Sequence, residues 1–90
     1  MFDGAESFNQ PLNNWDTSMV TNMSYMFHGA TSFDQSLEKW DITNIYSDFN
    51  HYHSMFSYSG LSKSNWEMML KNGHCWSMMN KAVLGLPSDY

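Results

Sequence analysis

Apolar residues return at fixed positions along the chain. Aligning Met26 with Met1 places MFHGATSFDQSLEKWD over MFDGAESFNQPLNNWD, and ten of these sixteen positions are identical. A third unit opens at Met55-Phe56, so the second interval is four residues longer than the first. Self-similarity at such a period indicates a repeat architecture, in which each unit buries its apolar face against the next. The extra four residues, within 47–54, are expected to form a surface loop.

Within the repeat, apolar residues at positions 23, 26, 27 and 30 follow the spacing of one face of a helix. Thr21 or Ser18 is suited to cap the start of this helix, and Gly29 is suited to the left-handed position that ends it. The pattern therefore predicts about two turns of α or 3₁₀ helix over residues 21–28.

The segment 15–18 follows the turn-forming pair Asn13-Asn14 and is predicted to be a short strand. The matching segment 40–43 of the second repeat is expected to pair with it in parallel. The predicted fold class is therefore an α/β repeat. It is a short, leucine-rich-repeat-like solenoid with one short parallel strand and one short helix in each coil of about 25 residues.

The repeat pattern stops near Gly60, where Leu61-Ser62 reads as an apolar residue before a helix cap, with Trp66 placed to pack back on Leu61. The pattern predicts a capping helix over residues 63–72, ended by Gly73, and a further short helix within 76–84. The chain is thus divided into repeats, residues 1–59, and a C-terminal capping helix with its tail, residues 60–90.

Residues that keep their place in the repeat are expected to form the core. They are Phe8, Leu12, Trp15, Val20, Met23, Met26, Phe27, Phe33, Leu37, Trp40, Ile45, Met55 and Phe56. Other aromatic and methionine side chains do not keep the repeat spacing, or lie at the uncovered first coil, and are expected to contact a partner. They are Phe2, Met19, Tyr25, Tyr46, Tyr52 and Tyr58.

The charge balance excludes several functions. Four lysines, no arginine and nine acidic residues give a net charge of −5, which disfavours binding to nucleic-acid phosphates. No apolar run approaches the roughly 20 residues of a membrane span, and no targeting signal is visible near the start of the chain. Because Cys75 is the single cysteine, no intrachain disulfide can form.

Candidate chemistry is sparse. His51 and His53, with His74 next to Cys75, make at most an incomplete ligand set for zinc, so no metal or cofactor is expected. A hydrolase that uses these residues is the competing hypothesis, but no nucleophile or phosphate-loop motif accompanies them. Asp16 and Asp41 recur in the repeat, so we interpret them as acceptors of backbone hydrogen bonds and not as a catalytic pair.

Amide-bearing side chains also recur. Asn9 stands at the position of Asp34, and Gln10 stands at that of Gln35. We expect these residues to build a ladder of hydrogen bonds from one repeat to the next, which would satisfy backbone groups between them.

The phrases MFDGAESFNQPLNNWDTSMVTNM and MFHGATSFDQSLEKWDITNI closely resemble the repeat of the BspA-like, leucine-rich-repeat-related surface proteins, a family also described as DUF285 or the mycoplasma-lipoprotein repeat. The run SMFSYSGLSKSNWEMML is similar to the terminal unit of that family. The resemblance implies an extracellular or cell-surface solenoid for adhesion and protein contact, without enzymatic activity.

The expected function is therefore non-enzymatic binding of other proteins: further repeats, a second copy or a larger assembly. The first coil would present Phe2, Phe8 and Leu12 at an uncovered edge. Two versions stay open, a repeat module of a surface adhesin and a small structural subunit docked through that edge. A signal peptide and further repeats upstream in the reading frame would favour the adhesin, and a genuine start at Met1 would favour the subunit.

Overall fold

The C-terminal part of the chain forms a helix where its cap signals predict one. Helix α1 spans Lys63–Asn72, and the Ser62 side chain caps it by accepting a hydrogen bond from the Asn65 N–H. Its buried face carries Trp66 and Met69, whereas Leu70 is exposed. The N–H of Gly73 donates to the Met69 carbonyl and ends the helix, so the predicted bounds are confirmed.

The segment after α1 contains two short helices in place of the single one expected. A 3₁₀ helix, η2, spans Trp76–Met78, and helix α2 spans Lys81–Leu84. Asn80 lies between them with an extended backbone, and its side chain accepts hydrogen bonds from the N–H groups of Ala82 and Val83. Because this cap starts a new helix, the two turns cannot merge. Gly85, with φ +86°, ends α2 in the left-handed conformation.

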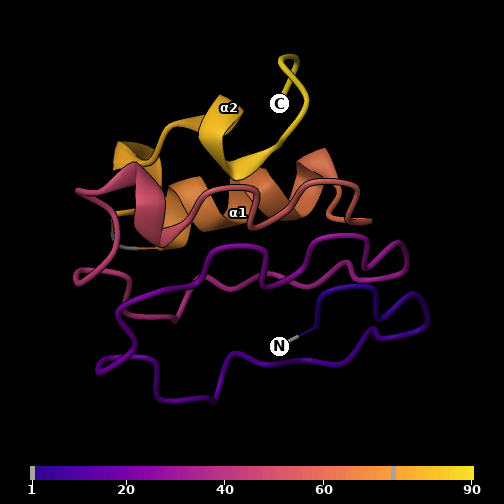
Figure 1. Cartoon of the computed structure of the whole chain (residues 1–90), viewed down its shortest axis with the longest axis horizontal. Coiled ribbons are helices and arrows are strands. Elements are labelled where there is room, and N and C mark those ends of the chain that lie inside the picture. The colour runs from indigo at the N-terminus through magenta and orange to yellow at the C-terminus, as the bar shows by residue number, and fades with distance from the viewer. Residues whose placement is uncertain (1, 74) are drawn as a thin grey trace.

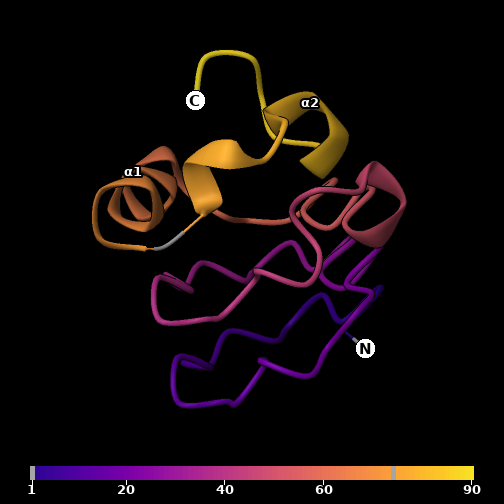
Figure 2. The same ribbon diagram turned by 90° about the vertical axis from the view of Figure 1, so that its left-hand side faces the viewer.

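The computed structural model describes residues 2–73 and 75–90, so Met1 and His74 lie outside the described residues. Figures 1 and 2 show the chain rising in layers, from the N-terminal repeat at one end to α1 and α2, which cover the other end. The domain measures 28 × 27 × 23 Å and is mostly irregular, with two short α-helices.

Neighbouring layers are joined by backbone hydrogen bonds whose sequence offset is constant within each pair of layers. The N–H groups of Phe2 and Gly4 donate to the carbonyls of Met26 and His28 in the second repeat. The donors at positions 23, 25, 27 and 29 reach the carbonyls at positions 51, 53, 55 and 57, an offset longer by the length of the insertion. Aligned repeats therefore lie directly above one another.

The predicted strands over 15–18 and 40–43 are wrong, because no residue in 2–73 or 75–90 has strand structure. The predicted helix over 21–28 is wrong as well, because that segment forms successive turns. The hydrogen bonds give the reason: N–H groups at odd positions from 23 to 29 reach the next repeat, whereas those of Met26 and His28 fold back to carbonyls three residues earlier. An α-helix or a parallel ladder would require a single, uniform pattern.

The four extra residues of the second repeat lie between Ile45 and Tyr52, where a 3₁₀ helix, η1, spans Phe49–His51. The predicted surface loop is accordingly found, with Phe49 exposed. Once the insertion is counted, Tyr52 takes the position of Met23. Tyr52 is fully buried, and its hydroxyl accepts a hydrogen bond from the Asn80 N–H. Its expected place on an exposed contact surface is therefore wrong.

The core runs through every layer. Of the residues expected there, nine are buried and three, Phe8, Val20 and Met26, are half-buried. The nine are Leu12, Met23, Phe27, Phe33, Leu37, Trp40, Ile45, Met55 and Phe56. Trp15 is 42% exposed. Side chains from α1, η2 and α2, including Trp66, Met69, Trp76 and Leu84, complete the same core, so residues 60–90 cover the last repeat.

Candidate interaction surfaces

A column of tryptophans connects the layers. The indole rings of Trp15 and Trp40 stack with centroids 6.4 Å apart and planes within 11°. The Trp40 indole N–H donates to the Leu12 carbonyl at 2.7 Å, and that of Trp76 donates to the Leu37 carbonyl at 3.2 Å. Because Leu12 and Leu37 are equivalent, the Trp76 indole makes the same hydrogen bond to the second repeat as Trp40 makes to the first. Sequence comparison missed it, since the residues around Trp76 do not follow the repeat.

Phenylalanines form two further columns. Phe27 stacks on Phe2 with ring centroids 5.5 Å apart, and on Phe56 at 5.6 Å, with planes within 4° and 2°. Phe8 stacks on Phe33 at 5.9 Å. Each of these first-repeat rings therefore stacks on a ring of the second repeat, and Phe2 and Phe8 also stack on each other with centroids 4.2 Å apart. These stacks add to the apolar burial.

A polar ladder lies beside the aromatic columns. The Asn9 side-chain oxygen accepts hydrogen bonds from the Asp34 N–H at 3.0 Å and from the Gln35 side chain at 2.8 Å. The equivalent oxygen of Asp34 accepts from the Ser62 N–H and from the Asn65 side chain, both at 2.8 Å. Gln35 thus reaches Asn9 and not its repeat equivalent Gln10. Burial acts to raise the pKa of Asp34, but the hydrogen bonds from Asn65 and Ser62 outweigh it and hold this pKa below its usual range.

Asp16 and Asp41 make identical local turns. One carboxylate oxygen of Asp16 accepts from both the hydroxyl and the N–H of Ser18, and the hydroxyl bond is the main reason why the pKa of Asp16 lies below its usual range. Asp41 accepts from the hydroxyl and the N–H of Thr43 in the same way. This geometry agrees with a structural role for both carboxylates. Between them, Thr17 is buried, donates to the Asp41 carbonyl and accepts from the Asp41 N–H.

Apolar side chains gather on the uncovered side of the first repeat. We call this surface the open end. It consists of Phe2, Phe8, Trp15 and Val20 of the first repeat and of Met26, the first residue of the second repeat. Trp15 is exposed and the other four are half-buried. A hollow of about 290 Å³ lies beside it, bordered by Trp15, Val20 and Met26 together with Met23. The open end is therefore an apolar surface at one end of the stacked repeats.

The residues expected to contact a partner are scattered. Met19, Tyr25 and Tyr58 are exposed, Phe2 and Tyr46 are half-buried, and Tyr52 belongs to the core. The His28 imidazole joins Tyr25 to Tyr58, and the His53 imidazole packs against Tyr25. We call this surface feature the ring ridge: Tyr25, His28, His53 and Tyr58. Its rings meet edge to face at centroid distances of 5.0–5.6 Å.

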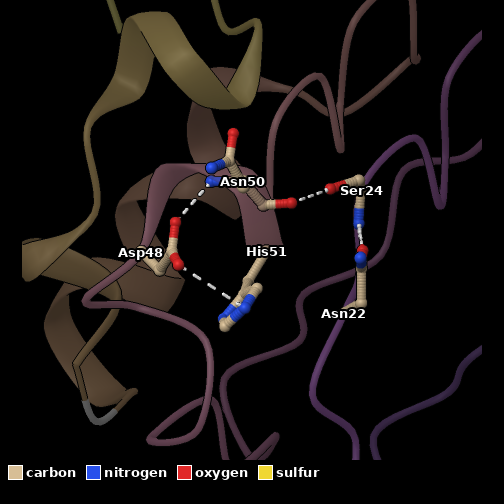
Figure 3. A network of polar contacts seen from close by, with 5 residues as sticks. All are labelled: Asn22, Ser24, Asp48, Asn50 and His51. Atoms are coloured by element: carbon tan, nitrogen blue, oxygen red, sulfur yellow. Dashed lines mark hydrogen bonds and ion pairs between the residues drawn. The ribbon is translucent and has the colours of Figure 1, made fainter.

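The inserted loop is held by its own polar contacts, drawn in Figure 3. The Asp48 side chain accepts from the Asn50 N–H at 2.9 Å, and its second oxygen lies 3.6 Å from Nε2 of His51. The Ser24 hydroxyl of the previous layer donates to the Asn50 carbonyl at 2.7 Å. These contacts fix η1 against the first repeat.

His51 and His53 lie in different environments. His51 faces Asp48 within the insertion, whereas His53 packs against Tyr25 in the ring ridge. Within the described residues, no three His, Cys, Asp or Glu side chains lie close enough together to hold one metal ion. His74, part of the competing hydrolase hypothesis, lies outside the described residues, and Cys75 is half-buried.

Another cavity, of about 580 Å³, lies at the opposite end of the molecule, between α1, α2 and the C-terminal residues. Trp66, Leu70 and Leu86 line its apolar part. The Lys81 ammonium at its edge donates to the Tyr90 carbonyl at 2.6 Å. It contains none of the site residues expected from the sequence.

The comparisons with known proteins identify a family for the chain. In the part of the chain that the structure describes, no helix has the length and apolar character needed to cross a membrane. The comparisons with curated proteins and with solved structures gave no match. A family model described as "Mycoplasma protein of unknown function, DUF285" matches residues 1–82. That match covers both repeats, the insertion and α1, so the chain belongs to the DUF285 family.

Proposed function

We propose that the chain is a non-enzymatic protein-binding module, built as a short leucine-rich-repeat-like solenoid, and that it binds another polypeptide at the open end of its first repeat. One observation carries the proposal. Trp15 and Trp40 are equivalent and stack on each other, yet Trp40 is 1% exposed and Trp15 is 42% exposed. The difference is the missing neighbour on the far side of Trp15.

The contacts that bury Trp40 indicate which groups a partner would need in order to bury Trp15. Trp40 is covered by a second indole ring, and its own N–H donates to a leucine carbonyl. Among the described residues, no acceptor is found for the Trp15 indole N–H. A polypeptide with an aromatic ring and a backbone carbonyl at the spacing of Trp15 and Leu12 would supply both. The partner we propose is therefore protein of the same repeat chemistry.

The constant hydrogen-bond offsets and the three aromatic columns support the solenoid. Stacked units of this kind bury their apolar side chains only against neighbours, so an end repeat is left with apolar surface. The C-terminal end of the stack is covered by α1, η2 and α2, whereas the open end has no such cover among the described residues.

The resemblance to BspA-like proteins supplies the biological setting of the proposal, which is adhesion at a cell surface. The alternative setting is a structural subunit of a larger assembly, docked through the same open end. Both use Phe2, Phe8 and Trp15 in the same way, so the exposure of Trp15 supports either one.

The test supplies the missing neighbour. A copy of residues 1–25 is joined ahead of Met1, and binding of an apolar dye, sedimentation and tryptophan fluorescence are compared with the original chain. We expect the original chain to bind the dye or to self-associate. The added repeat should reduce both and shift the fluorescence to shorter wavelength, because Trp15 becomes buried.

The matched control carries Leu12→Asp and Trp15→Ser in the added copy alone, and it should leave the open end uncovered. An original chain that is a monodisperse monomer, melts cooperatively and binds no dye would show that the open end needs no partner. The same conclusion would follow if the added repeat and its control behaved alike.

A further inference from the structure

The ring ridge is an exposed aromatic surface that the core does not use. Tyr58 is 78% exposed and Tyr25 is 44% exposed. The His28 imidazole lies between them, 5.6 Å from each ring, and its Nδ1 atom lies 3.1 Å from a carboxylate oxygen of Asp3. His53 extends the ridge beyond Tyr25 at 5.0 Å. The rings therefore form a continuous strip with one carboxylate at its side.

The backbone under both tyrosines is unfavourable for them. Tyr25 has φ +59° and Tyr58 has φ +60°, in the left-handed region that bulky side chains rarely occupy. Tyr58 stands where the repeat otherwise has Gly4 and Gly29, both left-handed, and Tyr25 stands where the second repeat has Ser54. Smaller residues thus satisfy the same backbone elsewhere in this chain. Folding alone does not account for two exposed tyrosines at these positions.

The net negative charge of the chain comes from its N-terminal residues, which include Asp3 beside the ridge. Residues 1–38 contain Asp3, Glu6, Asp16, Asp34 and Glu38, with no lysine or arginine. Residues 39–90 contain four acidic residues and four lysines, so the whole net charge of −5 belongs to the segment before Lys39. Asp3, which is well exposed, brings part of this charge to His28. A partner is therefore attracted here if it is basic.

We propose that the ring ridge binds a segment of a partner protein that carries arginine or lysine side chains. The cations lie over the faces of Tyr25 and Tyr58, and the Asp3 carboxylate pairs with one of them. This inference rests on the proposed protein-binding function, but it uses a surface that shares no residue with the open end.

The probe is a blocked peptide that alternates glycine with three arginines, titrated into the original chain at low salt. A peptide with glutamates in place of the arginines is the charge control. Nuclear magnetic resonance reports which residues shift. We expect the arginine peptide to move the signals of the ring ridge and Asp3, the glutamate peptide to leave them in place, and added salt to weaken the binding.

The variants use residues that the repeat itself carries at these positions. Tyr25→Ser and Tyr58→Gly keep the backbone that Ser54 and Gly29 adopt, so both should fold. Each substitution is expected to lower the affinity for the arginine peptide roughly two- to fivefold, and both together roughly tenfold. Asp3→Asn should weaken it as well. Met19→Ser, which changes an exposed apolar side chain outside the ridge, should bind as the original chain does.

The inference is overturned if the arginine peptide does not bind at millimolar concentration, if the glutamate peptide binds equally, or if the tyrosine variants bind as the original chain does. The open end gives an independent measurement. The tyrosine variants are also tested for dye binding and for its loss when a repeat is added. If both are unchanged while the ring ridge fails to bind the arginine peptide, the proposed function still holds. If the open end fails its own test while the ring ridge binds the arginine peptide, the open end is not the docking surface, and the proposal for the ring ridge still holds.

Discussion

Trp15 and Trp40 stand one above the other, at equivalent positions of consecutive repeats, with ring centroids 6.4 Å apart. Their exposure differs, because Trp15 lacks a covering layer. Trp40 has a layer on each side and donates its indole N–H to Leu12, whereas Trp15 has a layer on one side. The pair therefore compares a covered and an uncovered repeat within one molecule.

Replacing each tryptophan by phenylalanine measures that difference. Trp40→Phe leaves the buried Leu12 carbonyl without its donor and opens space in the core, so we expect it to lower the free energy of unfolding by about 2–3 kcal/mol. Trp15→Phe removes an exposed ring edge and should cost less than about 0.5 kcal/mol. Urea unfolding of both variants checks this. Equal losses would mean that the two repeats are covered alike.

The centre of the phenylalanine column gives a second prediction. Phe27 is fully buried between Phe2 and Phe56, so Phe27→Leu should cost about 1–2 kcal/mol through lost stacking and imperfect packing. Phe49→Leu, in the exposed insertion, is the matched control and should change the stability by less than about 0.5 kcal/mol. Thermal melts followed by near-ultraviolet circular dichroism measure both. Similar melting temperatures for the two variants would argue against the continuous core.

Alanine substitutions at two left-handed glycines distinguish the cost of backbone strain from the cost of steric overlap. A Cβ added at Gly4 meets no atom within 4 Å, so Gly4→Ala should cost only the strain of φ +74°, about 1 kcal/mol. A Cβ added at Gly85 would overlap the Ser57 side chain and backbone, so Gly85→Ala should cost about 2–4 kcal/mol. Chemical denaturation of both variants tests the ordering. A larger loss for Gly4→Ala would show that α2 does not pack against Ser57 as described.

The low pKa of Asp34 predicts a pH dependence. Because its pKa is lower in the folded chain than in the unfolded chain, its contribution to stability is complete above the unfolded value, roughly pH 4. That contribution disappears as the pH falls through the folded value. Asp34→Asn keeps an oxygen to accept from Ser62 but carries no charge, so its stability should fall less over this acidic range.

Urea unfolding between neutral pH and about pH 3 measures this difference. Asp89→Asn, which removes one carboxylate from an exposed position near the C-terminus, is the control and should follow the original chain. Parallel curves for the original chain and Asp34→Asn would show that the hydrogen bonds from Ser62 and Asn65 do not stabilise the ionised carboxylate.

Part of the structure followed from the order of residues. The repeat alignment anticipated that Trp15 lies over Trp40, and the cap at Ser62 with Trp66 four residues later anticipated α1. The first prediction depends on the identity of two segments, and the second depends on residues close together in the sequence. Both can therefore be made without knowledge of the fold. The placement of Tyr52 failed because the insertion shifted its register, and an alignment that allowed for the insertion would have matched Tyr52 with Met23.

The strand and helix predictions failed for a different reason. Positions 23, 27 and 30 are buried at helical spacing, but Tyr25 between them is left-handed and alternate N–H groups leave the segment for the next repeat. Spacing of apolar residues reports which side chains face the core. It does not report where the backbone donors go.

The sequence by itself determined the repeat and its length, the position of the insertion, the capping helix and the family. Local chemistry and internal identity are sufficient for these. The tertiary structure decided the rest: that Trp76 completes the tryptophan column, that the layers join through alternating turns, and that two tyrosines and two histidines from different layers meet in one ridge. Those features depend on which distant groups come within a few ångströms of each other, and such contacts have no signature in the order of residues.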